Sequence, residues 1–124
     1  MDETYERGMT TRREVLGADH VDRATASASS LDADFQNWIT KTAWGEVWSR
    51  PELDRRTRSL VTIAILAALG REELDLHLEA AANTGASPEE IAEVMFHVAV
   101  YAGIPAGHSG MRRLKARTGG DDDG

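Results

Sequence analysis

The sequence predicts an all-helical protein, and three observations support this. Apolar residues recur at spacings of three and four through most of the chain, glycine or proline stands at most breaks in that pattern, and no stretch has the alternation of a convincing strand. With 124 residues, 41% of them hydrophobic, the chain has the size of a single domain and can bury a small core.

The first part of the chain is predicted to hold two clear helices. Residues 5–16 form the first, closed by Gly17, whereas residues 20–30 are small and polar and allow either a short helix or a loop. The next helix is expected to end near Gly45, before the break at Pro51. Its apolar face is marked by residues at helical spacing: Leu31, Phe35, Trp38, Ile39 and Thr42.

The longest apolar run of the chain lies in the following helix. This helix is expected to begin near Asp54, whose carboxylate can cap free N–H groups, and to stop at Gly70. The apolar run, residues 60–69, is well short of the roughly 18 to 20 residues of a membrane span. We therefore interpret it as a buried core helix.

Three further helices are predicted towards the C-terminus. Residues 72–83 form one, ended by Gly85. The tetrad 87–90, Ser-Pro-Glu-Glu, is a capping box with proline at the first helical position, and it begins the next. Pro105 is expected to interrupt the pattern before a last helix over residues 106–117.

Composition excludes several classes of function. The net charge of −7 argues against binding to a nucleic-acid backbone. The absence of cysteine excludes disulfides and thiol chemistry, and the four histidines have no metal-ligand spacing, so no metal site is expected. No secretory signal or membrane span is recognisable, so we expect a soluble, cytoplasmic protein. Residues 118–124, rich in glycine and aspartate, are expected to form a disordered acidic tail.

The stretch from Trp44 to Arg58 is the most informative part of the sequence. It holds two tryptophans and four arginines within fifteen positions of an acidic chain. Such a concentration of cations predicts an anionic ligand, and a small carboxylate fits because the arginine fork binds carboxylates bidentately. The candidate residues are Trp44, Trp48, Arg50, Arg55, Arg56 and Arg58.

Five groups of residues together resemble the 4-carboxymuconolactone decarboxylase family, over residues 5 to about 110. They are 43–51 (AWGEVWSRP), 53–59 (LDRRTRS), Glu73 with His77, 83–85 (NTG) and 100–106 (VYAGIPA). The resemblance implies a single-domain helical bundle of the alkyl hydroperoxidase D type, with a core helical hairpin. It also implies ring-shaped homo-oligomers, namely hexamers built as trimers of dimers.

The resemblance further implies an activity, the decarboxylation of 4-carboxymuconolactone to 3-oxoadipate enol-lactone in protocatechuate catabolism, without a cofactor. The sister peroxidases carry a Cys-x-x-Cys pair before a histidine. Aligned through His77 and Gly85, the two cysteine positions fall on Gly70 and Glu73. Because the thiolate is the nucleophile in those enzymes, this chain cannot be such a peroxidase.

The implied reaction sets three tasks for the protein. The lactone carbonyl accepts the electron pair released as CO2 leaves, so the protein must position two carboxylates, face the developing oxyanion and protonate a ring carbon. Because the arginine fork binds carboxylates bidentately, we expect Arg58 first, then Arg50 and Arg55, to be the carboxylate anchors. His77 would be the proton donor or the oxyanion partner, with Glu73 orienting it.

Each of these assignments has a structural alternative. His77 lies at i+4 from Glu73, so the pair could be only a helix-surface contact worth roughly 0.2 to 0.5 kcal/mol. The arginines could form salt bridges, and the spacing of Trp44 and Trp48 favours core or interface packing over contact with substrate. Glu46, between the tryptophans, could bind the substrate or protonate it.

Two other functions stay open at this stage. One is a related decarboxylase or lactone-processing enzyme with another substrate, because a shared fold does not fix a substrate. The other is a non-catalytic helical oligomer that binds a small acid or a protein partner. Turnover of the lactone by the purified protein would separate these alternatives.

Overall fold

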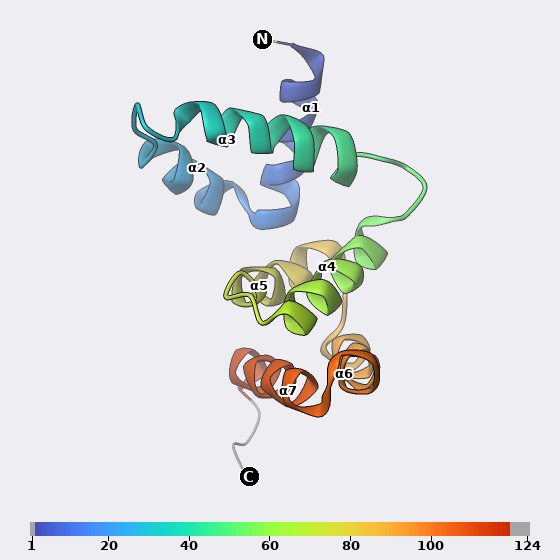
Figure 1. Ribbon diagram of the computed structural model, residues 1–124. Coiled ribbons are helices and arrows are strands. Elements are labelled where there is room, and N and C mark those ends of the chain that lie inside the picture. Colours follow the sequence, from blue (N-terminus) through green and yellow to red (C-terminus); the bar gives the residue numbers. More distant parts are fainter. Residues whose placement is uncertain (1, 120–124) are drawn as a thin grey trace. The chain divides into compact units, whose positions relative to one another are not determined.

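The computed structural model describes residues 2–119, and within this range every regular element is a helix (Figure 1). The predicted all-helical class is confirmed. The elements are α1 (Glu3–Leu16), α2 (Ala18–Ala26), α3 (Ala33–Ile39), the π-helix η1 (Thr40–Trp48), α4 (Arg55–Leu69), α5 (Leu74–Thr84), α6 (Pro88–Ala102) and α7 (Ile104–Thr118).

The contacts divide the chain into two compact units, with unit 1 ending at Arg55 and unit 2 beginning at Arg56. We describe each unit by itself. The predicted acidic tail lies mostly outside the described residues, although Thr118 closes α7 and Gly119 caps it in the left-handed region. The division into one domain over residues 1–117 and a tail stays a prediction.

Unit 1 is built on a close approach of α1 to η1. A Cβ placed on Gly8 would lie 2.1 Å from the carbonyl oxygen of Thr40, and one placed on Gly45 would lie 2.5 Å from that of Thr4. Only glycine fits at either position. The expectation that the helix ends near Gly45 is therefore wrong, because this glycine serves packing and the helix continues to Trp48 as a π-helix.

Two other expectations for unit 1 are resolved by the structure. The ambiguous segment after Gly17 forms a helix, α2, and buries Val21 completely. The apolar face expected on the next helix is largely exposed in the chain, since Leu31, Phe35 and Trp38 all face solvent. Helical spacing located that helix correctly but did not show which surface covers its apolar residues.

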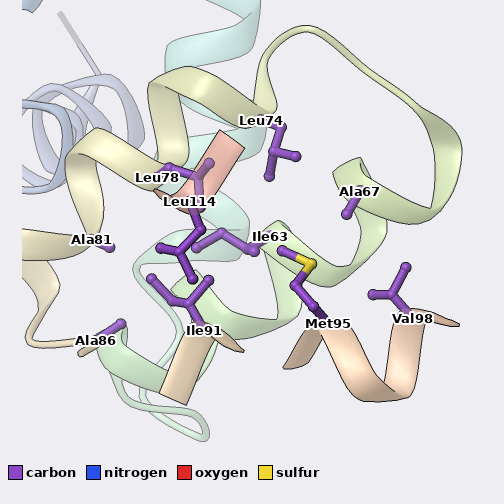
Figure 2. Close-up of a cluster of buried hydrophobic side chains, with 10 residues drawn as sticks. All are labelled: Ile63, Ala67, Leu74, Leu78, Ala81, Ala86, Ile91, Met95, Val98 and Leu114. Carbon is purple, nitrogen blue, oxygen red and sulfur yellow. The ribbon is translucent and has the colours of Figure 1, made fainter. Parts of the chain in front are cut away.

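Unit 2 has an aliphatic core contributed by α4, α5, α6 and α7 (Figure 2). The largest fully buried side chains in this core are those of Ile63 and Met95. The cluster consists of Ile63, Ala67, Leu74, Leu78, Ala81, Ala86, Ile91, Met95, Val98 and Leu114. The apolar run on α4 is buried on one face only, because Val61 and Ile65 are exposed.

The helix ends in unit 2 follow the predicted glycine and proline signals with two corrections. The capping box at Ser87 and Glu90 is present, and Gly85 ends α5 in the left-handed region. The start of α5 is later than predicted because Arg71 N–H closes α4 onto the carbonyl of Leu66, so the chain turns before the next helix. Pro105 does not interrupt a helix but lies in the first turn of α7, where its missing N–H costs no hydrogen bond.

None of the helices within residues 2–119 combines the length and the apolar character that crossing a membrane requires.

Candidate functional site

The predicted arginines Arg50 and Arg55 line one cavity of unit 1, with a volume of about 380 Å³. We call this cavity the arginine pocket. Trp48 also lines it, so three of the residues proposed from the sequence to contact substrate are brought together. The lining consists of Arg7, Thr11, Trp48, Ser49, Arg50, Pro51, Leu53, Asp54 and Arg55.

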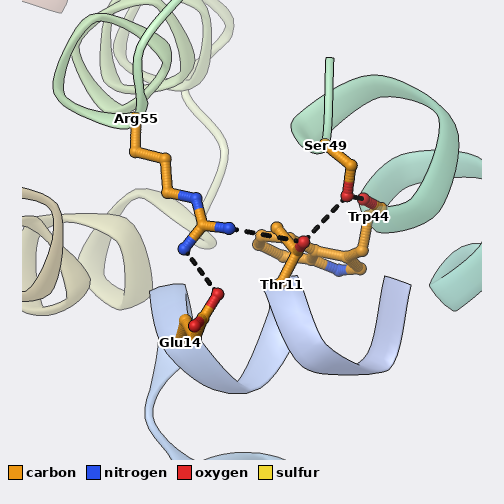
Figure 3. A network of polar contacts seen from close by, with 5 residues as sticks. All are labelled: Thr11, Glu14, Trp44, Ser49 and Arg55. Carbon is orange, nitrogen blue, oxygen red and sulfur yellow. Dashed lines mark hydrogen bonds and ion pairs between the residues drawn. The ribbon is translucent and has the colours of Figure 1, made fainter. Parts of the chain in front are cut away.

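A directed chain of hydrogen bonds holds Arg55 (Figure 3). The hydroxyl of Ser49 donates to the carbonyl of Trp44 at 2.7 Å, so the Thr11 hydroxyl is left to donate to Ser49 at 2.8 Å. Thr11 then accepts a long contact of 3.5 Å from Arg55, whose other terminal nitrogen donates to Glu14 at 2.8 Å. The guanidinium is therefore held in one orientation before any ligand binds.

The arginines of the pocket carry exposed counter-ions. Arg55 pairs with Glu14 at 2.8 Å, and Arg50 pairs with Glu52 at 3.4 Å, with all four side chains at least 40% exposed. Exposed ion pairs are worth only about 0 to 1 kcal/mol. An incoming carboxylate can therefore replace either glutamate at small cost.

The two tryptophans of η1 differ in position. Their rings stack with centroids 5.1 Å apart and both are buried, but Trp48 lines the arginine pocket whereas Trp44 is absent from its described lining. Trp44 thus supports the position of Trp48 and offers its carbonyl to Ser49. Glu46 is exposed on η1, and it too is absent from the described lining.

Six lining residues of the arginine pocket were not proposed as site residues from the sequence, among them Arg7, Thr11 and Ser49. Arg7 donates from Nε to the carbonyl of Gly45 at 3.1 Å, which fixes its side chain across the contact between α1 and η1. Thr11 and Ser49 stand 38 positions apart in the chain. Only the packing of α1 on η1 brings these residues together, so local spacing gave no signal for them.

His77 and Glu73 lie in unit 2, at the start of α5. His77 is half-buried on α5, and Glu73 is exposed in the turn before it, with the backbone N–H of His77 donating to the carbonyl of Glu73 at 3.3 Å. Burial lowers the pKa of His77 because it disfavours the charged imidazolium, and the negative charge of Glu73 opposes this only in part. His77 is therefore held as a neutral imidazole near pH 7.

Arg58, the first-ranked anchor of the sequence interpretation, lies half-buried on α4 in unit 2. The next residue, Ser59, is fully buried, and its hydroxyl meets that of Thr84 on α5 at 2.6 Å. This contact fixes α4 against α5 directly beside Arg58. Among residues 2–119, no group of three or more His, Asp or Glu side chains has an arrangement that could hold a metal ion.

Comparison with known proteins places this site in a family. The sequence model of the carboxymuconolactone decarboxylase family matches residues 33–116, which is more than half of the chain. The chain belongs to this family. The match begins at the start of α3 and extends into α7, so it includes Arg50, Arg55, Arg58 and His77.

Three relatives illustrate the similarity. A 4-carboxymuconolactone decarboxylase of Acinetobacter baylyi is 50% identical over 111 residues, which cover 89% of this chain and 83% of the relative. A nitrosuccinic acid decarboxylase of Metarhizium robertsii is 40% identical over 105 residues, or 82% of this chain and 72% of the relative. A 4-carboxymuconolactone decarboxylase of Pseudomonas putida is 44% identical over 42 residues, which are 34% of this chain and 88% of the relative.

Proposed function

We propose that this chain decarboxylates 4-carboxymuconolactone to 3-oxoadipate enol-lactone and CO2 without a cofactor. The observation that carries the proposal is the 50% identity, over 89% of the chain, to a 4-carboxymuconolactone decarboxylase. The arginine pocket adds chemical support, because it gathers Arg7, Arg50 and Arg55 around a space suited to an anionic ligand.

In the proposed mechanism, the arginines position the carboxylates of the substrate. Arg55 is already oriented by Thr11 and Glu14, so little side-chain entropy is lost when a carboxylate replaces the glutamate. Arg50 offers a second fork from the same pocket. Arg58, on α4, stays a separate candidate anchor from the sequence interpretation. Bidentate binding would hold the C–CO2 bond in a fixed direction relative to the lactone ring.

The substrate itself accepts the electron pair that is released when CO2 leaves. The C–CO2 bond breaks, its electron pair moves through the ring double bond, and negative charge develops on the lactone carbonyl oxygen. Protonation of the ring carbon next to the carbonyl completes the reaction. No external electron acceptor is required.

We propose that His77 serves the developing oxyanion. Its lowered pKa favours a neutral imidazole, which can donate one N–H to an enolate oxygen without carrying a full charge into the ground state. The alternative role, proton delivery to carbon, requires the imidazolium, and bound carboxylates would favour that form by raising the pKa. We propose that the negative charge of Glu73 favours the imidazolium form of His77 and so influences which of the two roles His77 takes.

The proposal is tested by turnover with purified protein. We expect the lactone to disappear and one equivalent of CO2 to appear per enol-lactone formed. An Arg50→Gln, Arg55→Gln double variant should bind and convert the lactone poorly, while Arg23→Gln, an exposed arginine of α2, serves as a control. Saturable binding of the lactone by the wild-type chain without CO2 release would instead favour a non-catalytic acid-binding protein.

A second candidate function is the decarboxylation of another small polycarboxylic acid. It is favoured by the 40% identity to a nitrosuccinic acid decarboxylase, which covers 82% of this chain. Carboxylate anchors and an oxyanion partner would serve either acid. Measuring kcat/KM for both acids decides between them, and we expect the lactone to be the better substrate.

We also propose that the chain forms a homo-oligomer, a hexamer made as a trimer of dimers. Support comes from apolar side chains exposed in unit 2 beside a groove of about 480 Å³ formed by α4 and α6. These side chains include Val61, Ile65, Leu69, Phe96, Val100 and Tyr101. Trp44 and Trp48, which the sequence suggested for this surface, are buried within the chain instead.

Sedimentation tests this assembly directly. The wild-type chain should sediment as one closed oligomer, and Ile65→Glu should yield smaller species because it places a charge in the apolar face. A monomeric wild-type chain at micromolar concentration would refute the proposal. Residence in the cytoplasm stays a prediction.

A further inference from the structure

A buried arginine in unit 1, Arg12, forms no ion pair with an aspartate or glutamate among residues 2–119. Arg12 on α1 is only 8% exposed. Its terminal nitrogens donate to two neutral groups, the hydroxyl of Thr40 at 3.1 Å and the amide oxygen of Gln36 at 3.2 Å. Among residues 2–119, no hydrogen-bond partner is present for its buried Nε.

The neighbouring arginine shows the usual arrangement. Arg13 is exposed and forms an ion pair with Asp22. Buried charges in proteins are normally paired or bound to an ion, because an isolated charge loses its hydration without compensation. Burial lowers the pKa of Arg12 for the same reason, yet an arginine stays protonated at neutral pH. An anion beside Arg12 would compensate this buried charge.

The space for that anion lies beside Arg12. A cavity of about 170 Å³ is lined by Arg12 together with Tyr5, Thr25 and Asn37, which can donate hydrogen bonds. In the described part of the chain, no aspartate or glutamate lines it. At roughly 30 Å³ per water molecule, the cavity holds the volume of about five or six waters. It suits an anion of a few heavy atoms and is much smaller than the arginine pocket.

We infer that this cavity is a binding site for a small carboxylate of one to three carbons, held by Arg12. The Nε–H and a second N–H on the same edge of a guanidinium form two parallel donors that match the two oxygens of a carboxylate. Gln36 and Thr40 occupy the terminal nitrogens and orient this edge. The site is independent of the proposed decarboxylation, and its ligand stabilises unit 1 by joining α1 to α3 and η1.

Thermal unfolding of the full chain tests the inference. Sodium formate, acetate or propionate, compared with sodium chloride at equal ionic strength, should raise the melting temperature saturably by a few degrees. Adamantane-1-carboxylate, whose rigid cage is too large for a cavity of about 170 Å³, should have no effect beyond that of ionic strength. Arg12→Met should abolish the response to the small carboxylates, whereas the matched control Arg13→Met should keep it.

A second variant keeps the test decisive if Arg12→Met does not fold. Ala28→Leu fills the cavity while leaving Arg12 in place, and it should also abolish the response. Three outcomes would overturn the inference: no specific response in the wild-type chain, an equal response in Arg12→Met or Ala28→Leu, or an equal response to adamantane-1-carboxylate. The first of these would show that Arg12 is a structural arginine only, or that a carboxylate from a second copy fills the cavity.

Discussion

The two units of this chain are stabilised in different ways. In unit 2, the core consists of nine buried apolar residues from four helices together with Ala86 in the turn between α5 and α6, and Ser59 is its buried polar residue in the described chain. In unit 1, Val15, Val21 and two tryptophans share the interior with Thr11, Arg12 and Thr40. Unit 1 therefore depends on the fit of polar groups and glycine backbones, whereas unit 2 depends on apolar burial.

This difference has a functional consequence. The polar interior of unit 1 borders two cavities that we propose as anion sites, the arginine pocket and the smaller cavity at Arg12. The α4 and α5 pair of unit 2 instead provides firm support for a single half-buried histidine, His77. We expect a substitution at His77 to lower kcat while leaving the melting temperature nearly unchanged. We expect substitutions in unit 1 to change KM or the free energy of unfolding.

The largest effect is expected for His77→Gln. If His77 faces the developing oxyanion, kcat should fall by about 100-fold, which corresponds to roughly 2.7 kcal/mol of transition-state stabilisation. The melting temperature should hardly change, because glutamine keeps a polar group on the same helix. Steady-state kinetics and thermal unfolding of the same preparation measure both quantities.

His20→Gln provides the matched control. His20 lies half-buried on α2 and is absent from the described lining of the arginine pocket, so its replacement should leave kcat close to wild type. If His77→Gln turns over at nearly the wild-type rate, His77 is a structural residue and the oxyanion partner must be sought elsewhere.

The next effect tests the glycine contact of unit 1. Gly8→Ala should destabilise the protein by about 2 kcal/mol, since its Cβ meets the backbone oxygen of Thr40 at 2.1 Å and the helices must separate. Gly110→Ala in unit 2 meets the side-chain sulfur of Met95 at 2.4 Å, and a methionine side chain can move aside. Its cost should be clearly smaller in urea unfolding, and equal costs would contradict the comparison.

These contacts also show what the sequence could predict. The helices of unit 2 were largely predictable because their ends carry local signals, such as Gly70, Gly85 and the Ser87 capping box. The π-helix was not predictable from the sequence. A glycine such as Gly45 locally predicts a helix end, and only the close approach of Thr4 on α1 explains why a glycine stands inside this helix. Local signals report helix ends, whereas close packing between distant segments is a property of the fold.

The residues of the candidate site likewise include some that the sequence could indicate and others that only the fold reveals. Arg50, Arg55 and Trp48 could be proposed because they stand close together in a chemically unusual stretch. Arg7 and Arg12 could not, since each is one of several arginines on an ordinary helix until α1 packs against η1. Their roles depend on burial and on partners far away in the sequence.

A smaller effect is expected for Arg55→Lys. Lysine keeps the charge but loses the fork that contacts both Glu14 and Thr11, so KM for the lactone should rise about tenfold, or roughly 1.4 kcal/mol. The neighbouring Arg56 is the control. It is exposed, pairs with Glu90 and is absent from the described lining of the arginine pocket. If Arg56→Lys raised KM as much as Arg55→Lys, the pocket would not be the substrate site.

The smallest effect concerns the dependence of stability on pH. Burial holds the pKa of His77 in the folded chain below the value of 6.5 expected when it is unfolded, so between those two values the unfolded chain binds more protons. This contribution to stability is fully present above pH 6.5 and is lost as the pH falls towards the folded pKa. Unfolding free energies measured from pH 7.5 down to 5.5 should therefore decline less steeply for His77→Gln than for the wild type. An unchanged slope in His77→Gln would mean that burial does not disfavour the charged form of His77.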